Sequence, residues 1–197
     1  MLFGREEGGE RVRSEVSNGG RRLNENEGEN GTLKGLRKHI SHLHVSIVKA
    51  QTKPFKVNSL KGIILHGGHG NRLRPFTHTG PKQLIPVANK PISQYVLESL
   101  RESGIRDVAI VLGGIYPDKV KEYYGDGSSF GVKVTYIYQG EPKGIAHAVG
   151  LCREFVGDEP FVVHLGDDLL KGGVKKFVEE FDNSTYDGMV LLCEVKD

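Results

Sequence analysis

Apolar residues follow two alternating patterns from residue 60 onward. Short runs of apolar residues, typical of buried strands, alternate with segments in which apolar residues recur every third or fourth position, as they do in helices. The strand-like segments are 61–65, 107–114, 132–140, 161–168 and 188–195. The helix-like segments are 91–104, 117–125, 144–157 and 173–181. This alternation predicts an α/β fold with a doubly wound, mainly parallel, Rossmann-like sheet.

The first 59 residues do not share this pattern. Residues 1–32 are dominated by Gly, Glu, Arg, Asn and Ser, so they cannot bury enough apolar surface to offset the loss of chain entropy. Residues 33–59 contain one short mixed stretch with room for a small helix or strand. We therefore expect residues 1–59 to be a disordered or poorly structured leader and residues 60–197 to form the folded domain.

Composition excludes several broad classes of protein. With 37% hydrophobic residues, 26% charged residues and a formal net charge of +2, the chain has globular values and no overall bias toward a nucleic acid or a membrane. No apolar run approaches the roughly 18 residues needed to span a bilayer, and the N-terminus lacks the pattern of a secretion signal. We expect a cytoplasmic protein.

Candidate chemistry begins where the first predicted strand of the domain ends. Gly67, Gly68 and Gly70 follow that strand directly, and backbone N–H groups of such a loop can turn toward an anion. Arg72 and Lys82 add full positive charges suited to phosphate. No acidic residue lies between Glu29 and Glu98, whereas eleven Lys or Arg do. The segment therefore predicts a phosphate-binding loop at a strand end, where doubly wound sheets bind ligands.

The same residues admit plainer interpretations. Glycines after a strand are often only a tight turn, and this loop is neither a Walker A sequence nor a dinucleotide fingerprint. Asp167 and Asp168 after a later strand are compatible with a turn or a helix cap, and Gln139 with an ordinary loop amide. RNA binding through the acid-free segment is disfavoured because no aromatic-rich recognition motif accompanies the charge.

A longer stretch resembles a known family. GIILHGGHGNRLRPFTHTGPKQLIPVANKPI is similar to the signature of the sugar-phosphate nucleotidyltransferases, roughly G-G-x-G-[ST]-R-[LM]-x-P-x-T followed by P-K. It is most similar to glucose-1-phosphate thymidylyltransferases of the archaeal type. The resemblance continues through YGDGSSFGVKVTYIYQGEPKGIAHAV and FVVHLGDDLL and covers about residues 60–197. It identifies this region as the N-terminal portion of a nucleotidyltransferase domain.

The resemblance implies a reaction and a set of residues for it. Such enzymes join a nucleoside triphosphate, here dTTP or UTP, to a sugar 1-phosphate, here glucose 1-phosphate, and release pyrophosphate. Arg72 and Lys82 match the catalytic cations, and Asp167 matches a ligand of the Mg²⁺ cofactor. The matched nucleotide-binding positions are Leu65, Gly67, Gly68, Gly70, Asn71, Gln83, Gln139 and Gly144. The resemblance further suggests a homo-oligomer.

The chain also departs from the family pattern. His66 replaces a small residue with an imidazole large enough to crowd the loop, Asn71 replaces a hydroxyl residue and can still hydrogen-bond a phosphate, and Asp168 replaces the Asn of G-D-N. Relatives begin near the counterpart of Leu60 and continue past the counterpart of Asp197 with an E-K-P-type segment and a second metal-binding Asp. We therefore expect residues 1–59 to be an added leader and the chain to be a fragment or a truncated product. The alternative function is a non-catalytic nucleotide-binding or regulatory domain.

Overall fold

One sheet organises the molecule. The computed structural model describes residues 12–17, 40–49 and 59–194, with side chains described for residues 45–49 and 59–192. Within this part, seven strands pair in the order β1-β9-β2-β8-β3-β6-β7. Their bounds are β1 Val12–Ser17, β2 Ile40–Val48, β3 Lys61–His66, β6 Asp107–Gly113, β7 Lys133–Gly140, β8 Phe161–Leu165 and β9 Gly188–Glu194. Strands β8, β3, β6 and β7 pair in parallel.

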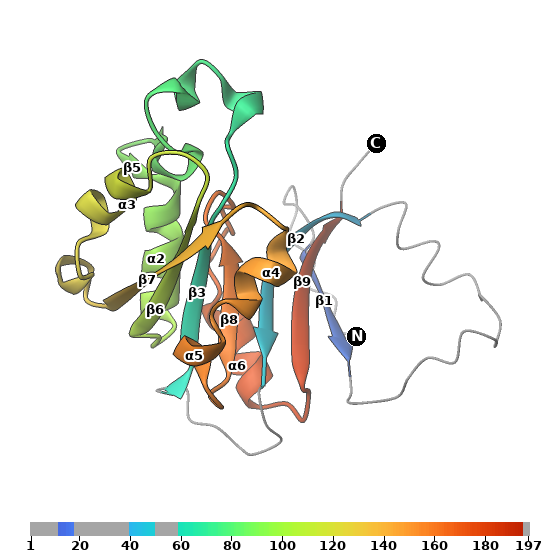
Figure 1. Ribbon diagram of the computed structural model, residues 1–197. Coiled ribbons are helices and arrows are strands. Elements are labelled where there is room, and N and C mark those ends of the chain that lie inside the picture. The colour runs from blue at the N-terminus through green and yellow to red at the C-terminus, as the bar shows by residue number, and fades with distance from the viewer. Residues whose placement is uncertain (1–11, 18–39, 50–58, 195–197) are drawn as a thin grey trace.

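Helices cover both faces of this sheet (Figure 1). The helices are α2 Ile92–Glu102, α3 Pro117–Tyr124, α4 Ile145–Gly150, α5 Arg153–Val156 and α6 Lys175–Asp182. Successive residues of β3 serve opposite faces: Ile64 packs in the core that contains residues of α2, α3 and α6, and Ile63 packs in the core that contains residues of α4 and α5. A doubly wound, mainly parallel α/β fold is therefore confirmed. No helix in the described ranges combines the length and apolar character needed to cross a bilayer.

The predicted elements agree with the observed ones except at one helix. The segment 144–157 is divided into α4 and α5 because the backbone tightens between them. Cys152 N–H donates to the carbonyl of Val149, three residues back, in place of the fourth-residue partner of an α-helix. Smaller elements complete the edge near β3: 3-10 helices η2 Asn71–Leu73, η3 Phe76–His78 and η4 Lys82–Leu84, and a hairpin of β4 Pro86–Val87 with β5 Lys90–Pro91.

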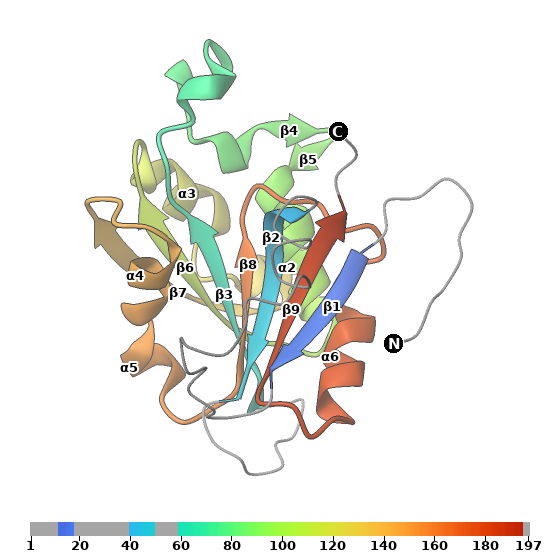
Figure 2. The same cartoon turned by 90° about the vertical axis from the view of Figure 1, so that its right-hand side faces the viewer.

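Two strands precede the predicted domain boundary at residue 60. Strand β2 pairs antiparallel with both β8 and β9, and β1 pairs antiparallel with β9 (Figure 2). Val45 and Ile47 alternate with Ser46 and are buried in the main core, which explains why this short stretch joins the sheet. The described parts of the expected leader thus belong to the fold, contrary to the expectation. The remainder of that segment, 1–11, 18–39 and 50–58, lies outside the described residues.

Candidate active site

The carboxyl ends of four parallel strands form one edge of the sheet. Because β3, β6, β7 and β8 run in the same direction, the loops that follow them lie at this edge. The loop after β3 extends beyond the edge and carries η2 and η3 (Figure 1). Most of the residues predicted for phosphate, base and metal are on these four loops, so the fold brings them to one place.

The glycine loop after β3 has a backbone that needs glycine. Gly68 and Gly70 have φ angles of +94° and +63°, a region that side chains disfavour. A Cβ on Gly70 would lie 2.8 Å from Cγ2 of Thr77, whose hydroxyl donates to the Gly70 carbonyl at 2.9 Å. A Cβ on Gly114 would lie 2.7 Å from the carbonyl oxygen of Gly68. The loops after β3 and β6 therefore pack backbone against backbone.

Sequence reasoning did not assign Thr77 or Gly114 to the site. A usable signal was present for Gly114, because Gly113 and Gly114 follow a buried strand just as Gly67 and Gly68 do. Thr77 belongs to the quoted family pattern, but its hydrogen bond to Gly70 depends on the fold of the loop.

Lys82 and Asp167 form an ion pair across this edge. Lys82 comes from η4 and Asp167 from the turn after β8, 85 positions later in the sequence. Their side chains are 22% and 31% exposed, so the pair is accessible from solvent while shielded on one side. The structure thus places the predicted catalytic lysine beside the predicted metal ligand, within reach of a shared ligand.

Arg72 and Asn71 lie in η2, on the exposed part of the loop. In the described part of the chain, the Arg72 guanidinium has no hydrogen bond or ion pair, so it can reach an incoming anion without first breaking a contact. Leu65 differs, because its side chain packs into the core on the α4 side of β3. Its carbonyl accepts the N–H of Gly166 at 3.0 Å, which joins the end of β3 to the turn that carries Asp167.

Gln139 and Gly144 meet at the end of β7. The Gln139 amide donates from Nε2 to the Gly144 carbonyl at 3.1 Å and lies 3.4 Å from Nδ1 of His147. Cβ atoms added to Gly67 and Gly113 would each lie 3.2 Å from its Oε1. The two predicted base-reading residues are therefore neighbours, and the amide lies against the glycine loops.

Gln83 points away from solvent. Its side chain is fully buried, and its Nε2 donates to the Gly67 carbonyl at 3.0 Å. The main-chain carbonyl of Gln83 accepts from the Ser93 hydroxyl at 2.9 Å, and the Ser93 hydroxyl lies 2.6 Å from the Tyr124 hydroxyl. These buried polar groups lie beneath the glycine loop, and neither Ser93 nor Tyr124 was predicted to belong to the site.

His66 belongs to the same buried cluster. Its ring meets Tyr124 edge-on, with centroids 6.1 Å apart, and neither ring nitrogen has a partner among the described residues. Burial lowers the pKa of His66 from 6.5 to about 3, so the ring is neutral near pH 7. The imidazole also lies close to the turn after β8, where a Cβ added to Gly166 would lie 2.8 Å from its Cδ2.

The donor set at Asp167 suits a magnesium ion held jointly with a ligand. Among the described residues, no group of three or more His, Cys, Asp or Glu side chains could hold a metal by itself. Mg²⁺ commonly uses one or two carboxylates together with substrate phosphates and water. The partly exposed Asp167 carboxylate beside the glycine loop fits that role. Asp168 follows in the turn, where its N–H lies 3.4 Å from the Leu165 carbonyl.

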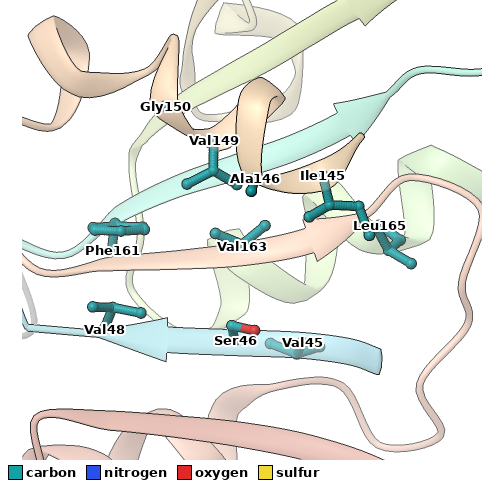
Figure 3. A pocket seen from close by; sticks show the side chains of 10 residues that line it. All are labelled: Val45, Ser46, Val48, Ile145, Ala146, Val149, Gly150, Phe161, Val163 and Leu165. Carbon is teal, nitrogen blue, oxygen red and sulfur yellow. The ribbon is translucent and has the colours of Figure 1, made fainter. Parts of the chain in front are cut away.

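An apolar pocket of about 390 Å³ lies between α4 and strands β2 and β8 (Figure 3). Val163 and Leu165 of β8 form its floor, and Ile145 and Val149 of α4 lie opposite. Its lining contains no charged side chain. Phosphate recognition uses charged side chains or free backbone N–H groups, so this apolar lining does not suit a phosphate, and neither Lys82 nor Asp167 is part of it.

Comparison with known proteins agrees with this geometry. The profile of the family described as "Nucleotidyl transferase" matches residues 61–197, which is more than half of the chain. The chain belongs to the nucleotidyl transferase family. Strands β1 and β2 precede the matched region, whereas the loops that form the site lie within it.

Relatives within the family have more specific names. The low-salt glycan biosynthesis nucleotidyltransferase Agl11 of Haloferax volcanii is 49% identical over 138 residues, 70% of this chain and 39% of that protein. A glucose-1-phosphate thymidylyltransferase of Streptomyces griseus is 46% identical with the same coverage. A solved structure from Bacillus anthracis, described as a glucose-1-phosphate thymidylyltransferase in complex with a sucrose, gives a TM-score of 0.61 at 41% identity and covers 63% of this chain and 50% of that one. The chain thus spans about two fifths of the length of these curated relatives.

Proposed function

We propose that this protein is a sugar-1-phosphate nucleotidyltransferase that joins dTTP or UTP to glucose 1-phosphate, in the manner of a glucose-1-phosphate thymidylyltransferase. The observation that supports this most directly is the Lys82–Asp167 pair beside the glycine loop. It combines a mobile cation, a carboxylate for Mg²⁺ and a backbone suited to phosphate at one edge of the sheet. As a family member without a described membrane helix, it is expected to act in the cytoplasm.

The proposed chemistry is an in-line displacement at the α-phosphorus. An oxygen of the sugar phosphate forms the new P–O bond, and the bond to the bridging oxygen of pyrophosphate breaks, so that pyrophosphate leaves with the electron pair. The attacking oxygen is already anionic and needs no general base. The chain's part is to position the phosphates and to balance their charge, with Lys82 at the reacting phosphates and Arg72 at the leaving group.

The remaining residues have supporting roles in this proposal. We assign the phosphates to Gly67, Gly68, Gly70 and Asn71, and the base to Gln139 and Gly144, which are hydrogen-bonded neighbours beside the glycine loop. Asp167 would hold Mg²⁺, which would supply positive charge to balance the charge that develops on the pyrophosphate. Leu65 contributes through its backbone, which fixes the turn that carries Asp167.

The test is release of pyrophosphate. The full chain is incubated with dTTP or UTP, Mg²⁺ and glucose 1-phosphate, and the pyrophosphate released is measured. The control is the same reaction without glucose 1-phosphate. Arg72→Ala is expected to lower the rate at least about tenfold, because it removes a charge that binds the leaving group. The control is Arg153→Ala, which removes the same charge from another exposed position and is expected to leave the rate unchanged. No sugar-dependent pyrophosphate release would contradict the enzyme proposal.

A non-catalytic nucleotide-binding domain is the second candidate. It rests on the glycine loop and Lys82, which provide for binding of phosphates and do not by themselves provide for turnover. This function predicts tight binding of dTTP with Mg²⁺ and no turnover in the same assay.

A further inference from the structure

Gln83 makes a contact that its predicted role as a nucleotide ligand does not require. Its amide is completely buried and donates from Nε2 to the carbonyl of Gly67 at 3.0 Å. The opposite amide orientation would place two oxygen acceptors against each other, so the chemistry of the contact fixes which end of the amide faces Gly67. The side chain therefore acts on the glycine loop from below.

This contact sets the direction of the next backbone N–H. In a planar trans peptide, the carbonyl oxygen and the N–H point in opposite directions. Because the Gly67 carbonyl points inward to Gln83, the N–H of Gly68 points outward from the buried cluster. In the described part of the chain this N–H has no hydrogen-bond partner, and a Cβ on Gly68 would lie 4.0 Å from Cε of Lys82. A free donor therefore lies beside the cation proposed to bind phosphate.

We propose that Gln83 is a positioning residue of the phosphate loop: it holds the Gly67–Gly68 peptide so that the Gly68 N–H faces the phosphates of the bound nucleotide. This inference rests on the proposed nucleotide binding and deepens it. Gln83 acts through the loop, and its effect is on the phosphates and not on the base.

The surroundings of Gln83 hold it in this position. The Ser93 hydroxyl donates to the main-chain carbonyl of Gln83 at 2.9 Å, and the Tyr124 hydroxyl lies 2.6 Å from that hydroxyl. The amide oxygen Oε1 of Gln83 is buried without a partner among the described residues, so the bond to Gly67 is the one that orients the amide. On the other side, a Cβ on Gly166 would lie 2.8 Å from His66 and 3.2 Å from Cγ of Gln83, so Gly166 lies in close contact with both. Lys82 directly precedes Gln83 in the sequence, and Asp167 directly follows Gly166. The packing of Gln83 against Gly166 therefore also positions the two residues of the ion pair.

The deciding experiment compares three ligands. Affinities for dTTP, inorganic pyrophosphate and thymidine are measured calorimetrically, with Mg²⁺ present, for the full chain and for Gln83→Met, which keeps the approximate volume but removes the donor. We expect affinities for dTTP and pyrophosphate to fall by the same factor, about tenfold, as is typical for loss of one hydrogen bond to a charged ligand. Gln94→Met, on α2 and bonded to Glu98, is the matched control and is expected to change neither affinity.

Each result decides one question. A fall for dTTP and thymidine with unchanged pyrophosphate binding would mean that Gln83 reads the nucleoside, and it would overturn the inference. Unchanged affinity for all three ligands would overturn it too. Failure of the unmodified chain to bind dTTP or pyrophosphate would instead refute the proposed nucleotide binding itself, before any variant is considered.

A measurement on the unmodified protein covers the case in which Gln83→Met does not fold. In a ¹⁵N-glycine-labelled sample, pyrophosphate with Mg²⁺ is expected to shift the Gly68 amide resonance strongly, because that N–H gains a charged acceptor. The amide of Gly131, far along the chain in the loop before β7, is the internal control. A Gly68 resonance that does not move under saturating pyrophosphate would overturn the inference.

Discussion

The imidazole of His66 is buried beneath the glycine loop without a hydrogen-bond partner for either ring nitrogen in the described structure. Burial lowers the pKa of His66 from 6.5 to about 3. Between about pH 6.5 and pH 3, therefore, the imidazole is protonated in the unfolded chain and neutral in the folded chain. Its contribution to stability is complete above about pH 6.5 and is lost as the pH falls toward 3. By pH 5 the loss amounts to about 2 kcal/mol of the free energy of unfolding.

His66→Leu is therefore expected to weaken the pH dependence of stability. Urea unfolding at pH 7, 6 and 5 should show a smaller fall in the free energy of unfolding for His66→Leu than for the unmodified protein, by about 2 kcal/mol at pH 5. Equal falls in both proteins would show that His66 is protonated without penalty in the folded state.

Lys82 occupies the place next to Asp167 that a metal ion would otherwise share. Removing its charge with Lys82→Met should have opposite effects on two ligands. Affinity for dTTP is expected to fall about tenfold or more, because a charge-assisted phosphate contact is lost. Affinity for Mn²⁺ in the absence of nucleotide is expected to rise, because Asp167 loses its cationic partner.

Calorimetry with dTTP and electron paramagnetic resonance with Mn²⁺ measure these two changes. The exposed Lys133 serves as the control, since Lys133→Met makes the same chemical change at the amino end of β7, opposite the edge that carries the pair. A parallel loss of both ligands in Lys82→Met would indicate that Lys82 supports the fold of the site and not its charge balance.

Among the elements, the loops after β3 and β6 are joined by a glycine contact. Gly114→Ala would place a Cβ 2.7 Å from the Gly68 carbonyl, which is backbone and cannot move aside cheaply. We expect lower stability and at least about tenfold weaker dTTP binding, because the phosphate-binding backbone is displaced. Thermal unfolding and calorimetry measure the two effects.

Gly131→Ala is the control that separates the effect of backbone strain from the effect of the contact between Gly114 and Gly68. Gly131 also has a positive φ, +72°, but its added Cβ would only meet Cδ of Arg101 at 3.4 Å. It is expected to lose about 1 to 2 kcal/mol of stability and to retain dTTP affinity. Similar dTTP affinity in both variants would show that the two loops need not touch.

The sequence predicted those elements whose signals are local. Strand β3 and helix α2 follow directly from apolar periodicity, and the edge that joins Lys82 to Asp167 follows from the rule that parallel strands share their carboxyl ends. The inward orientation of Gln83 was not predictable, because its partner Gly67 lies 16 positions earlier and the contact depends on how the connection from β3 to β4 folds. The place of β2 inside the sheet was missed for a related reason: its partners, including His164 and Leu191, lie more than a hundred positions later.

For the molecule as a whole, β2 is an interior strand supplied from outside the region that matches the family. A chain that starts at residue 60 should lose the pairings of both β8 and β9 with β2 and the buried side chains of Val45 and Ile47. We expect it to unfold without cooperativity or to aggregate, since exposed strand edges promote association.

A chain that starts at residue 40 keeps β2 and is the matched comparison. It should remain soluble and unfold in a single transition, as followed by circular dichroism and size-exclusion chromatography. Equal behaviour of the two truncated chains would show that β2 is dispensable.

The distance along the chain between Lys82 and Asp167 bears on the timing of biosynthesis. At roughly 5 to 20 residues per second, a ribosome adds Asp167 about 4 to 17 seconds after Lys82, given the 85 positions between them. During that interval the cationic loop exists without its carboxylate partner and without strand β8 beside β3. If the proposed nucleotide binding holds, phosphates can therefore meet the complete Lys82–Asp167 pair only after β8 and the turn that follows it have been synthesised.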